Sequence, residues 1–343
     1  MKKVTILGHF AFGENVLNGQ TIKTKIIADE LERSLGQDAV CREDTSGGWR
    51  FLLLLPLVIW RILSRSQHVI IAPAYKAILL ISPLLVFMNF FFHRKLHYVT
   101  IGGRLPLVLR KYMVMRWIAR RFDAIYVETD LVCEELQEFT LQNVVVMPNC
   151  KPLSIVGRDE IIQWEKPPYR LCTFSRVMPE KGIAEAIEAV RLYNEQKGPV
   201  FELDIYGQVE DEEWFHRLME GQPAVIRYKG CVDFAQTSRV LRHYFMMLFP
   251  TSYPGECFAG TLIDALAAGL PVLASDWRSN AELIEEGRTG FLFPVHDIEA
   301  MVKILGEAVQ LPMRVQAMRV ACIEKAWNYL PERVLQCLLQ RLV

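Results

Sequence analysis

Apolar and polar residues alternate along the chain in a pattern that predicts strands and helices in turn. Short apolar runs typical of buried strands are separated by longer stretches in which apolar residues recur every three or four positions, as in helices. The first half contains the predicted strands Val4–Gly8, His68–Pro73, Leu96–Ile101, Ala124–Glu128 and Val144–Met147. The predicted helices between them cover about 21–35, 49–65, 75–93, 106–121 and 130–140. Strands that alternate with helices indicate a parallel, doubly wound sheet.

The same alternation begins again after Lys151–Pro168, a segment of weak periodicity with two adjacent prolines that we interpret as a linker. The second set of predicted strands is Tyr169–Ser175, Phe201–Tyr206, Val225–Tyr228, Met246–Phe249 and Pro271–Ala274. We therefore expect an α/β protein with two Rossmann-like domains, 1–155 and 156–330, which face each other across a cleft. Residues 331–343 are predicted to form a C-terminal helix that packs back toward the first domain.

Length and composition agree with two globular domains. A chain of 343 residues corresponds to two domains of about 150 residues. A content of 51% hydrophobic and 23% charged residues excludes a disordered or coiled-coil protein. The eight cysteines form no C-x-x-C pair and follow no secretory signal, which predicts reduced thiols in the cytoplasm. The histidines show no zinc spacing, so we expect no metal, and we interpret His93 and His97 as part of a basic surface edge.

The formal net charge of zero conceals an acid-free segment, residues 45–122. Its twelve basic residues are Arg50, Arg61, Arg65, Lys76, Arg94, Lys95, Arg104, Arg110, Lys111, Arg116, Arg120 and Arg121. Positive charge without acidic neighbours favours partners that carry phosphate.

Two apolar runs lie inside this segment. Phe51–Trp60 and Ala77–Phe92 have ten and sixteen residues without a charge, fewer than the roughly 18 to 20 that a membrane-spanning helix needs. Each run can be a buried helix of the first domain. Alternatively, its apolar side chains dip into an anionic bilayer while nearby cations bind lipid phosphates. We favour contact of 45–122 with an anionic membrane, hence a cytoplasmic protein held peripherally at the inner face of the cell membrane, with no nucleic-acid partner.

The loops after the strands are where a doubly wound domain binds its ligands. The strongest of them lies in 250–275, where a strand, a glycine-containing loop and a helix beginning near Gly260 follow one another. Free N–H groups at such a helix start favour an anion such as a diphosphate. These groups belong to Cys257, Phe258, Ala259 and Gly260. The carboxylates of Glu256 and Asp264 would repel phosphate, so we assign them to sugar or ribose hydroxyls.

A second candidate loop follows the first strand of the second domain. It carries Arg176 and Lys181, two cations that can neutralise the charge of a departing diphosphate. Weaker candidates for substrate binding are Gly207 and Val232 after later strands, and Gly19 before the first helix of the first domain.

The segment from Glu256 to Asp264 resembles the Glu-x₇-Glu region of retaining glycosyltransferases of family four, which have the GT-B fold. Residues 275–294 resemble the next segment of that family. The resemblance implies that Glu256 contacts the transferred sugar, that the residue at 264 holds the ribose, and that Arg176 and Lys181 stabilise the diphosphate. Asp264 stands where the family usually has glutamate, which shortens its reach by one methylene. Where many relatives have a histidine after the fourth strand, this chain has Gly102, Gly103 and Arg104.

The resemblance implies a glycosyltransferase that uses a nucleotide sugar, a UDP-sugar being favoured, and needs no cofactor. The absence of a D-x-D motif in the sequence agrees with a metal-independent reaction. A first domain that contacts the membrane favours a lipid-linked saccharide as acceptor, as in bacterial capsule or exopolysaccharide synthesis. Two alternatives stay open: a nucleotide-sugar epimerase of the same fold, and a non-catalytic membrane-bound partner in a polysaccharide assembly complex.

Overall fold

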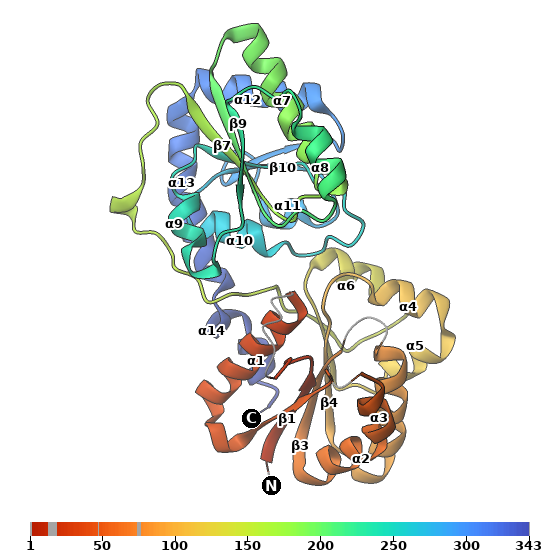
Figure 1. Cartoon of the computed structure of the whole chain (residues 1–343). Helices are drawn as coiled ribbons and strands as arrows, with labels where there is room; N and C mark the ends of the chain where they lie inside the picture. The colour runs from red at the N-terminus through yellow and green to blue at the C-terminus, as the bar shows by residue number, and fades with distance from the viewer. Residues whose placement is uncertain (1, 13–18, 47, 74–76, 343) are drawn as a thin grey trace. The chain divides into compact units, whose positions relative to one another are not determined.

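The computed structural model describes residues 2–12, 19–46, 48–73 and 77–342, and the chain divides into two compact units (Figure 1). The first unit comprises Met1–Pro152 and Leu330–Val343, and the second comprises Leu153–Tyr329. The sequence predicted that the first domain ends at 155 and the second at 330, and the two units divide after Pro152 and after Tyr329. Two short helices, α14 (Pro331–Val334) and α15 (Gln336–Leu339), occupy the C-terminal segment where a single helix was predicted.

The first unit is built on a six-stranded parallel sheet in the order β2-β1-β3-β4-β5-β6. Its strands are β1 (Lys2–Gly8), β2 (Val40–Asp44), β3 (Ser66–Ala72), β4 (Lys95–Val99), β5 (Ala124–Val127) and β6 (Val144–Val146). Its other helices are α1 (Gly19–Leu35), α2 (Gly48–Arg65), α3 (Ile78–Phe92), α4 (Leu105–Lys111), α5 (Met113–Ala119) and α6 (Asp130–Gln137). The strand order reverses between β1 and β3.

Helices cover both faces of this sheet. Because parallel crossovers are right-handed, α1 lies on one face and α2 to α5 lie on the other (Figure 1). The C-terminal segment joins the α1 side, where Leu335 and Leu338 pack into one core with Val4 and Ile6. Residues 330–343 thus complete the first unit after the chain has formed the second.

The second unit has a six-stranded parallel sheet in the order β12-β11-β10-β7-β8-β9. Its strands are β7 (Tyr169–Phe174), β8 (Phe201–Tyr206), β9 (Ile226–Gly230), β10 (Met246–Phe249), β11 (Val272–Ser275) and β12 (Gly290–Phe293). Its helices are α7 (Ile183–Lys197), α8 (Glu212–Met219), α9 (Thr237–Leu241), α10 (Gly260–Ala267), α11 (Asn280–Leu283), α12 (Ile298–Gln310) and α13 (Pro312–Ala326). Here the strand order reverses between β7 and β10. Two doubly wound Rossmann-like units are what the sequence predicted.

The two strands that the sequence pattern did not predict, β2 and β12, each lie at the edge of a sheet. β2 has the sequence Val-Cys-Arg-Glu-Asp and is only partly buried after its first residue. An edge strand packs against a single neighbour, so it does not need the continuous apolar run by which central parallel strands are recognised. Strand β12, in contrast, is a short apolar run, Gly-Phe-Leu-Phe, that the pattern missed, whereas the strands at the opposite edges, β6 and β9, were predicted.

Two further details differ from the sequence predictions. The helix expected over 106–121 is interrupted at Tyr112, whose φ of −125° and ψ of 101° are extended. The Leu109 carbonyl at the end of α4 accepts a 2.7 Å hydrogen bond from Arg116 Nε, which satisfies a group that a continuous helix would pair internally. His97 is buried rather than on a surface edge, and its ring nitrogens lie 3.1 Å from His68 and 3.3 Å from Tyr126.

Candidate active site

The second sheet brings two predicted loops together at the point where its strand order reverses. β7 and β10 are neighbours, so the loop 175–182 after β7 and the loop 250–259 after β10 leave the same edge of the sheet side by side. Arg176 and Lys181 lie on the first loop and Glu256 lies on the second. In open parallel sheets this reversal is where ligands bind.

Close backbone contacts fix these loops against each other. Gly182 has a φ of +70°, and a Cβ at this position would lie 2.1 Å from the Pro250 carbonyl oxygen, so only glycine fits. The Ser252 N–H donates to the Glu180 carbonyl at 2.8 Å. Gly207, after β8, has a φ of +134°, and a Cβ there would lie 1.7 Å from the Ser175 carbonyl oxygen. Gly207, which the sequence assigns to substrate binding, therefore also packs closely against the residue before Arg176.

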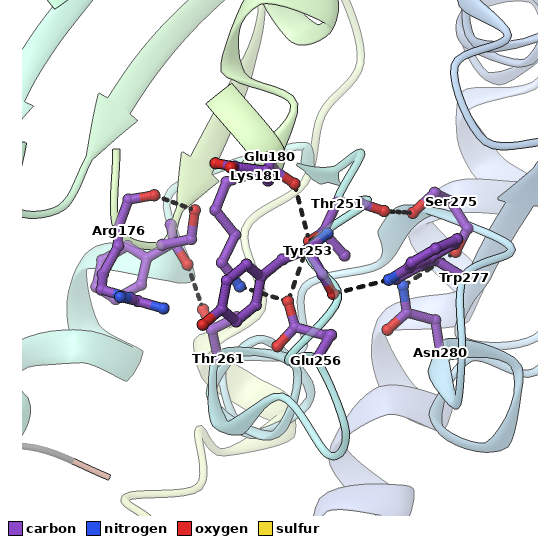
Figure 2. A network of polar contacts seen from close by, with 12 residues as sticks. Arg176, Glu180, Lys181, Thr251, Tyr253, Glu256, Thr261, Ser275, Trp277 and Asn280 are labelled. Carbon is purple, nitrogen blue, oxygen red and sulfur yellow. Dashed lines mark hydrogen bonds and ion pairs between the residues drawn. The ribbon is translucent and has the colours of Figure 1, made fainter. Parts of the chain in front are cut away.

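Lys181 and Glu256 form a buried ion pair at the centre of this arrangement (Figure 2). Their exposed fractions are 7% and 8%. Lys181 Nζ donates to Glu256 Oε2, and the Thr251 hydroxyl lies 3.1 Å from the same oxygen. A lysine ammonium has three donors, and Glu256 takes one of them. The sequence assigns Glu256 to the transferred sugar and Lys181 to the diphosphate, and in the structure these two side chains pair with each other.

The ring of Tyr253 contacts both cations of the predicted site. The Arg176 guanidinium carbon lies 5.2 Å from the ring centre, and Lys181 Nζ lies 5.1 Å from it (Figure 2). Arg176 also pairs with Glu210 and is about half exposed. Burial alone would lower the pKa of Arg176, but its hydrogen bonds to Tyr253 and Glu210 outweigh that effect and raise the pKa above its ordinary value. Arg176 therefore stays positively charged beside Lys181.

Helix α10 begins at Gly260, where the sequence predicted its start. Its N-cap residue, Ala259, has no side-chain acceptor with which to cap the first-turn N–H groups. The Thr261 hydroxyl donates to the Phe174 carbonyl at 2.6 Å and ties the helix start to the end of β7. This keeps the first turn of α10 next to the two loops.

The side chains predicted around this helix start are mostly buried in the protein itself. Cys257, Phe258 and Ala259 are at most 8% exposed, and the Phe258 ring packs 5.4 Å from that of Tyr329. The side chains of Phe258 and Ala259 belong to the core of the second unit. Asp264 is also buried, in the middle of α10.

Two weaker candidates lie elsewhere. Val232 follows β9 and packs partly against the core under α10. Gly19 is the first residue of α1 in the first unit, and a Cβ there would meet no atom within 4 Å. The neighbouring Asn18, quoted with it in the sequence prediction, lies outside the described residues.

Residues that the sequence predictions missed complete the polar network in Figure 2. The Ser275 hydroxyl donates to the Thr251 carbonyl at 2.6 Å, and Asn280 Nδ2 donates to the Ser275 carbonyl at 3.0 Å. Trp277 Nε1 donates to the Tyr253 carbonyl at 2.9 Å. Tyr253 could have been noticed as an aromatic residue just before Glu256, whereas nothing in the sequence marks the Trp277 contact. These bonds hold the loop that carries Glu256 to the end of β11.

The first unit contains a second buried lysine–glutamate pair, which the sequence predictions also missed. Lys23 Nζ on α1 lies 2.5 Å from Glu128 Oε1 and donates to the Thr100 carbonyl at 3.1 Å. Glu128 and Thr100 follow β5 and β4, so this pair also lies at the carboxyl edge of its sheet. Neither unit shows a cluster of three or more metal-ligating side chains among its described residues.

The second unit matches a known protein family. Residues 158–328 match the model described as glycosyl transferases group 1. The chain is 30% identical over 198 residues to the UDP-N-acetylglucosamine–peptide N-acetylglucosaminyltransferase GtfA subunit of Streptococcus gordonii, a match covering 54% of this chain and 38% of that protein. It is 31% identical over 187 residues to the amylovoran biosynthesis glycosyltransferase AmsK of Erwinia amylovora, covering 51% and 45%. The matched part of the chain spans less than half the length of either relative.

A solved structure resembles the chain over its whole length. The crystal structure of Anabaena HepE in complex with UDP has a TM-score of 0.77 at 16% identity, and the match covers 100% of this chain and 99% of that one. At this identity the likeness shows a shared fold, that of the GT-B glycosyltransferases.

Proposed function

Because residues 158–328 place this chain in the group 1 glycosyltransferase family, we propose that it moves a glycosyl group from a UDP-sugar to an acceptor hydroxyl, with retained anomeric configuration and without a metal ion. One observation carries the proposal. Arg176, Lys181 and Glu256 meet at the reversal of the second sheet, held by Tyr253 and Thr251. The complex of the similarly folded Anabaena protein with UDP supports a uridine nucleotide as the donor.

The proposed reaction needs positive charge at the leaving diphosphate and hydrogen-bond acceptors at the hydroxyls of the sugar and the ribose. The bond between the sugar C1 and the diphosphate oxygen breaks, and a bond from C1 to the acceptor oxygen forms on the same face. Arg176, the two remaining donors of Lys181 and the first-turn N–H groups of α10 stabilise the leaving diphosphate. Glu256 and Asp264 accept hydrogen bonds from the transferred sugar and the ribose. The leaving phosphate takes the proton of the acceptor hydroxyl.

For the acceptor we favour a lipid-linked saccharide of a cell-surface polysaccharide, such as a capsule, met at the inner face of the cell membrane. The name of the Erwinia relative supports polysaccharide synthesis. The name of the Streptococcus relative supports a second candidate acceptor, a peptide hydroxyl. Transfer from a radiolabelled UDP-sugar in a membrane-containing extract separates the two, because label in a lipid-linked product enters organic solvent and label on protein precipitates with acid.

The test of the proposed reaction is UDP release from a panel of UDP-sugars. Replacing Arg176 or Lys181 by Ala should lower turnover about 100-fold, the loss typical of removing one charge-stabilising group. Lys303 is an exposed cation on α12, and Lys303→Ala is the matched control that should retain activity. Turnover of the Lys181 variant within a few-fold of wild type, in a folded protein, would contradict the proposal. Conversion of the UDP-sugar to an isomer without UDP release would identify an epimerase, and binding without turnover a non-catalytic partner.

A further inference from the structure

The outer side of the helices α2 to α5 is apolar. Of the twenty large hydrophobic side chains that are exposed in the described part of the chain, fourteen lie between Leu52 and Trp117. Five belong to α2, four to α3, and five to α4, α5 and the residue between them. We call these fourteen side chains the outer apolar surface. Monomeric soluble proteins rarely expose apolar patches beyond a few hundred Å², so a concentration of this kind marks an interaction site.

The helical periodicity shows that the outer apolar surface is distinct from the core. On α2, Leu53, Leu57 and Trp60 follow one another at helical spacing and are 57–70% exposed. Leu55 and Ile59 on the same helix are at most 4% exposed and face the sheet. Helix α2 is therefore apolar on both sides, although only its inner side is covered.

Helix α3 continues the outer apolar surface. Leu80, Phe87 and Phe91 repeat at helical spacing on its outer side, and the rings of Phe87 and Phe91 pack edge to face at 6.3 Å. Helix α3 packs beside α2 and α5, and α5 packs beside α4 (Figure 1). The exposed side chains thus belong to adjacent helices that cover one face of the first sheet.

Cations accompany this surface and acids are absent from its segment. Arg61 and Arg65 follow Leu57 at intervals of four residues, so they lie on the same side of α2 toward its end. Both are exposed. Lys111 Nζ lies 5.3 Å from the ring centre of Tyr112, and the Arg121 guanidinium carbon lies 4.6 Å from that of Trp117. Acids from outside 45–122 pair with some of the cations, as Glu43 does with Arg61, Asp123 with Lys95 and Glu138 with Arg110.

We propose that the outer apolar surface docks on an anionic lipid bilayer, with the leucine and phenylalanine side chains of α2 and α3 in the acyl region and Arg65, Lys111 and Arg121 at the lipid phosphates. Tryptophan and tyrosine next to cations are suited to the headgroup level, where one end of the side chain is apolar and the other wet. A second copy of the chain fits less well, because a two-fold contact would place the same acid-free basic segment against itself. No helix among the described residues is long and apolar enough to cross a membrane, so the contact is peripheral.

This inference deepens the proposed function, since a lipid-linked acceptor would be met at the same bilayer, but the docking itself does not require enzymatic turnover. The test is sedimentation of the full chain with phosphatidylcholine vesicles that contain or lack phosphatidylglycerol. Wild type should bind the acidic vesicles at low salt. Its affinity should fall as salt rises from about 0.1 M to about 1 M and the Debye length shortens from about 10 Å to about 3 Å.

Two variants separate the apolar and the charged contributions. Leu53→Ser, Leu57→Ser, Phe87→Ser and Phe91→Ser together should abolish vesicle binding, while the exposed pair Leu311→Ser and Met313→Ser in the second unit is the matched control that should not. Arg65→Glu, Lys111→Glu and Arg121→Glu together should weaken binding to acidic vesicles at least about 100-fold, at about fivefold for each cation. Lys197→Glu with Lys303→Glu, exposed cations of the second unit, is the control for charge.

Failure of wild-type protein that is folded by circular dichroism to bind acidic vesicles at low salt would overturn the proposal. So would unchanged binding by the serine variant. A concentration-dependent dimer that the serine variant abolishes, without vesicle binding by either protein, would assign the surface to a second copy instead. Hydrolysis of a soluble UDP-sugar is measured in parallel. Its absence in wild type would contradict the proposed function, whereas vesicle binding would still stand.

Discussion

Each unit of this chain buries a lysine–glutamate pair at the carboxyl edge of its sheet, and the two pairs differ in what surrounds them. Lys23 and Glu128 are 4% and 5% exposed, and Lys181 and Glu256 are 7% and 8% exposed. Lys23 donates to Glu128 and to the Thr100 carbonyl, so it ties α1 to the ends of β4 and β5. Lys181 and Glu256 instead come from two loops.

The surroundings of the second pair are those of a binding site. Lys181 lies 5.1 Å from the ring centre of Tyr253 and 5.5 Å from that of Phe249, and aromatic faces attract the cation without using its N–H donors. Arg176, which pairs with Glu210, adds a second, half-exposed cation beside the Tyr253 ring. Burial and ion pairing alone therefore do not mark a reactive lysine. We infer that the Lys23 pair maintains the fold and the Lys181 pair takes part in the reaction.

The largest expected effect comes from leaving one buried lysine without its carboxylate. Glu128→Leu should lower the free energy of unfolding by about 3–5 kcal/mol, because the Lys23 ammonium is then buried without an opposite charge. Lys23→Met combined with Glu128→Leu should recover most of that loss, since two apolar side chains replace the pair. Denaturant unfolding measures the stability of both variants. A double variant no more stable than Glu128→Leu alone would show that the pair does more for stability than cancel its own two charges.

The buried histidine of the first unit, His97, should make the stability of the protein depend on pH. Burial, followed by the effect of His68, lowers the pKa of His97 from 6.5 to about 4, so the ring is neutral in the folded protein. The unfolded chain binds a proton below about pH 6.5 and the folded chain only near pH 4, so stability is lost as the pH falls through this window. The loss should be about 3 kcal/mol at about 1.4 kcal/mol per pH unit.

Urea unfolding between pH 7 and pH 4 measures this effect of His97. His97→Leu should flatten the acid limb of the stability profile, while His93→Leu, at an exposed position, is the control that should leave it unchanged. An acid limb as steep in the His97 variant as in wild type would assign the pH dependence to other groups.

Glu256→Gln tests whether Glu256 acts on the transferred sugar and not on the nucleotide. The amide keeps the shape of the side chain but removes the charge that pairs with Lys181 and accepts sugar hydroxyls. Turnover should fall about 100-fold, or about 2.7 kcal/mol, by analogy with loss of one group that acts in the transition state. Affinity for UDP by calorimetry should change little, because Glu256 is assigned to the sugar. A collapse of UDP affinity as large as the loss of turnover would show that assignment to be wrong.

The smallest effect is expected for Thr251→Val, which removes the hydroxyl 3.1 Å from Glu256 Oε2. One hydrogen bond to a charged group contributes about 1.5–3 kcal/mol at most, and Lys181 still holds the carboxylate. We expect turnover to fall by roughly tenfold or less with no change in UDP affinity. A loss as large as that of Glu256→Gln would make Thr251 an equal member of the site.

The central strands, the helices and both candidate loops could be predicted from the sequence because each is marked by a local pattern. Strand β2 could not, since its sequence Val-Cys-Arg-Glu-Asp lacks a continuous apolar run, and the short apolar run of β12 was missed. Lys181 and Glu256 were both predicted as site residues but not as partners, because a contact between residues 75 positions apart depends on the strand order. The apolar run of α2 left a buried helix and a surface helix as alternatives. The structure gives both, with Ile59 inside and Leu57 outside.

The most direct test of the account compares the two pairs in one assay, with Lys181→Met plus Glu256→Leu set against Lys23→Met plus Glu128→Leu. Both double variants exchange a buried ion pair for apolar side chains, so both should fold. UDP release from the best UDP-sugar should fall at least about 100-fold in the first variant and stay within a few-fold of wild type in the second. Equal losses in the two folded variants, or full activity in the first, would contradict the claim that the Lys181–Glu256 pair is the centre of glycosyl transfer.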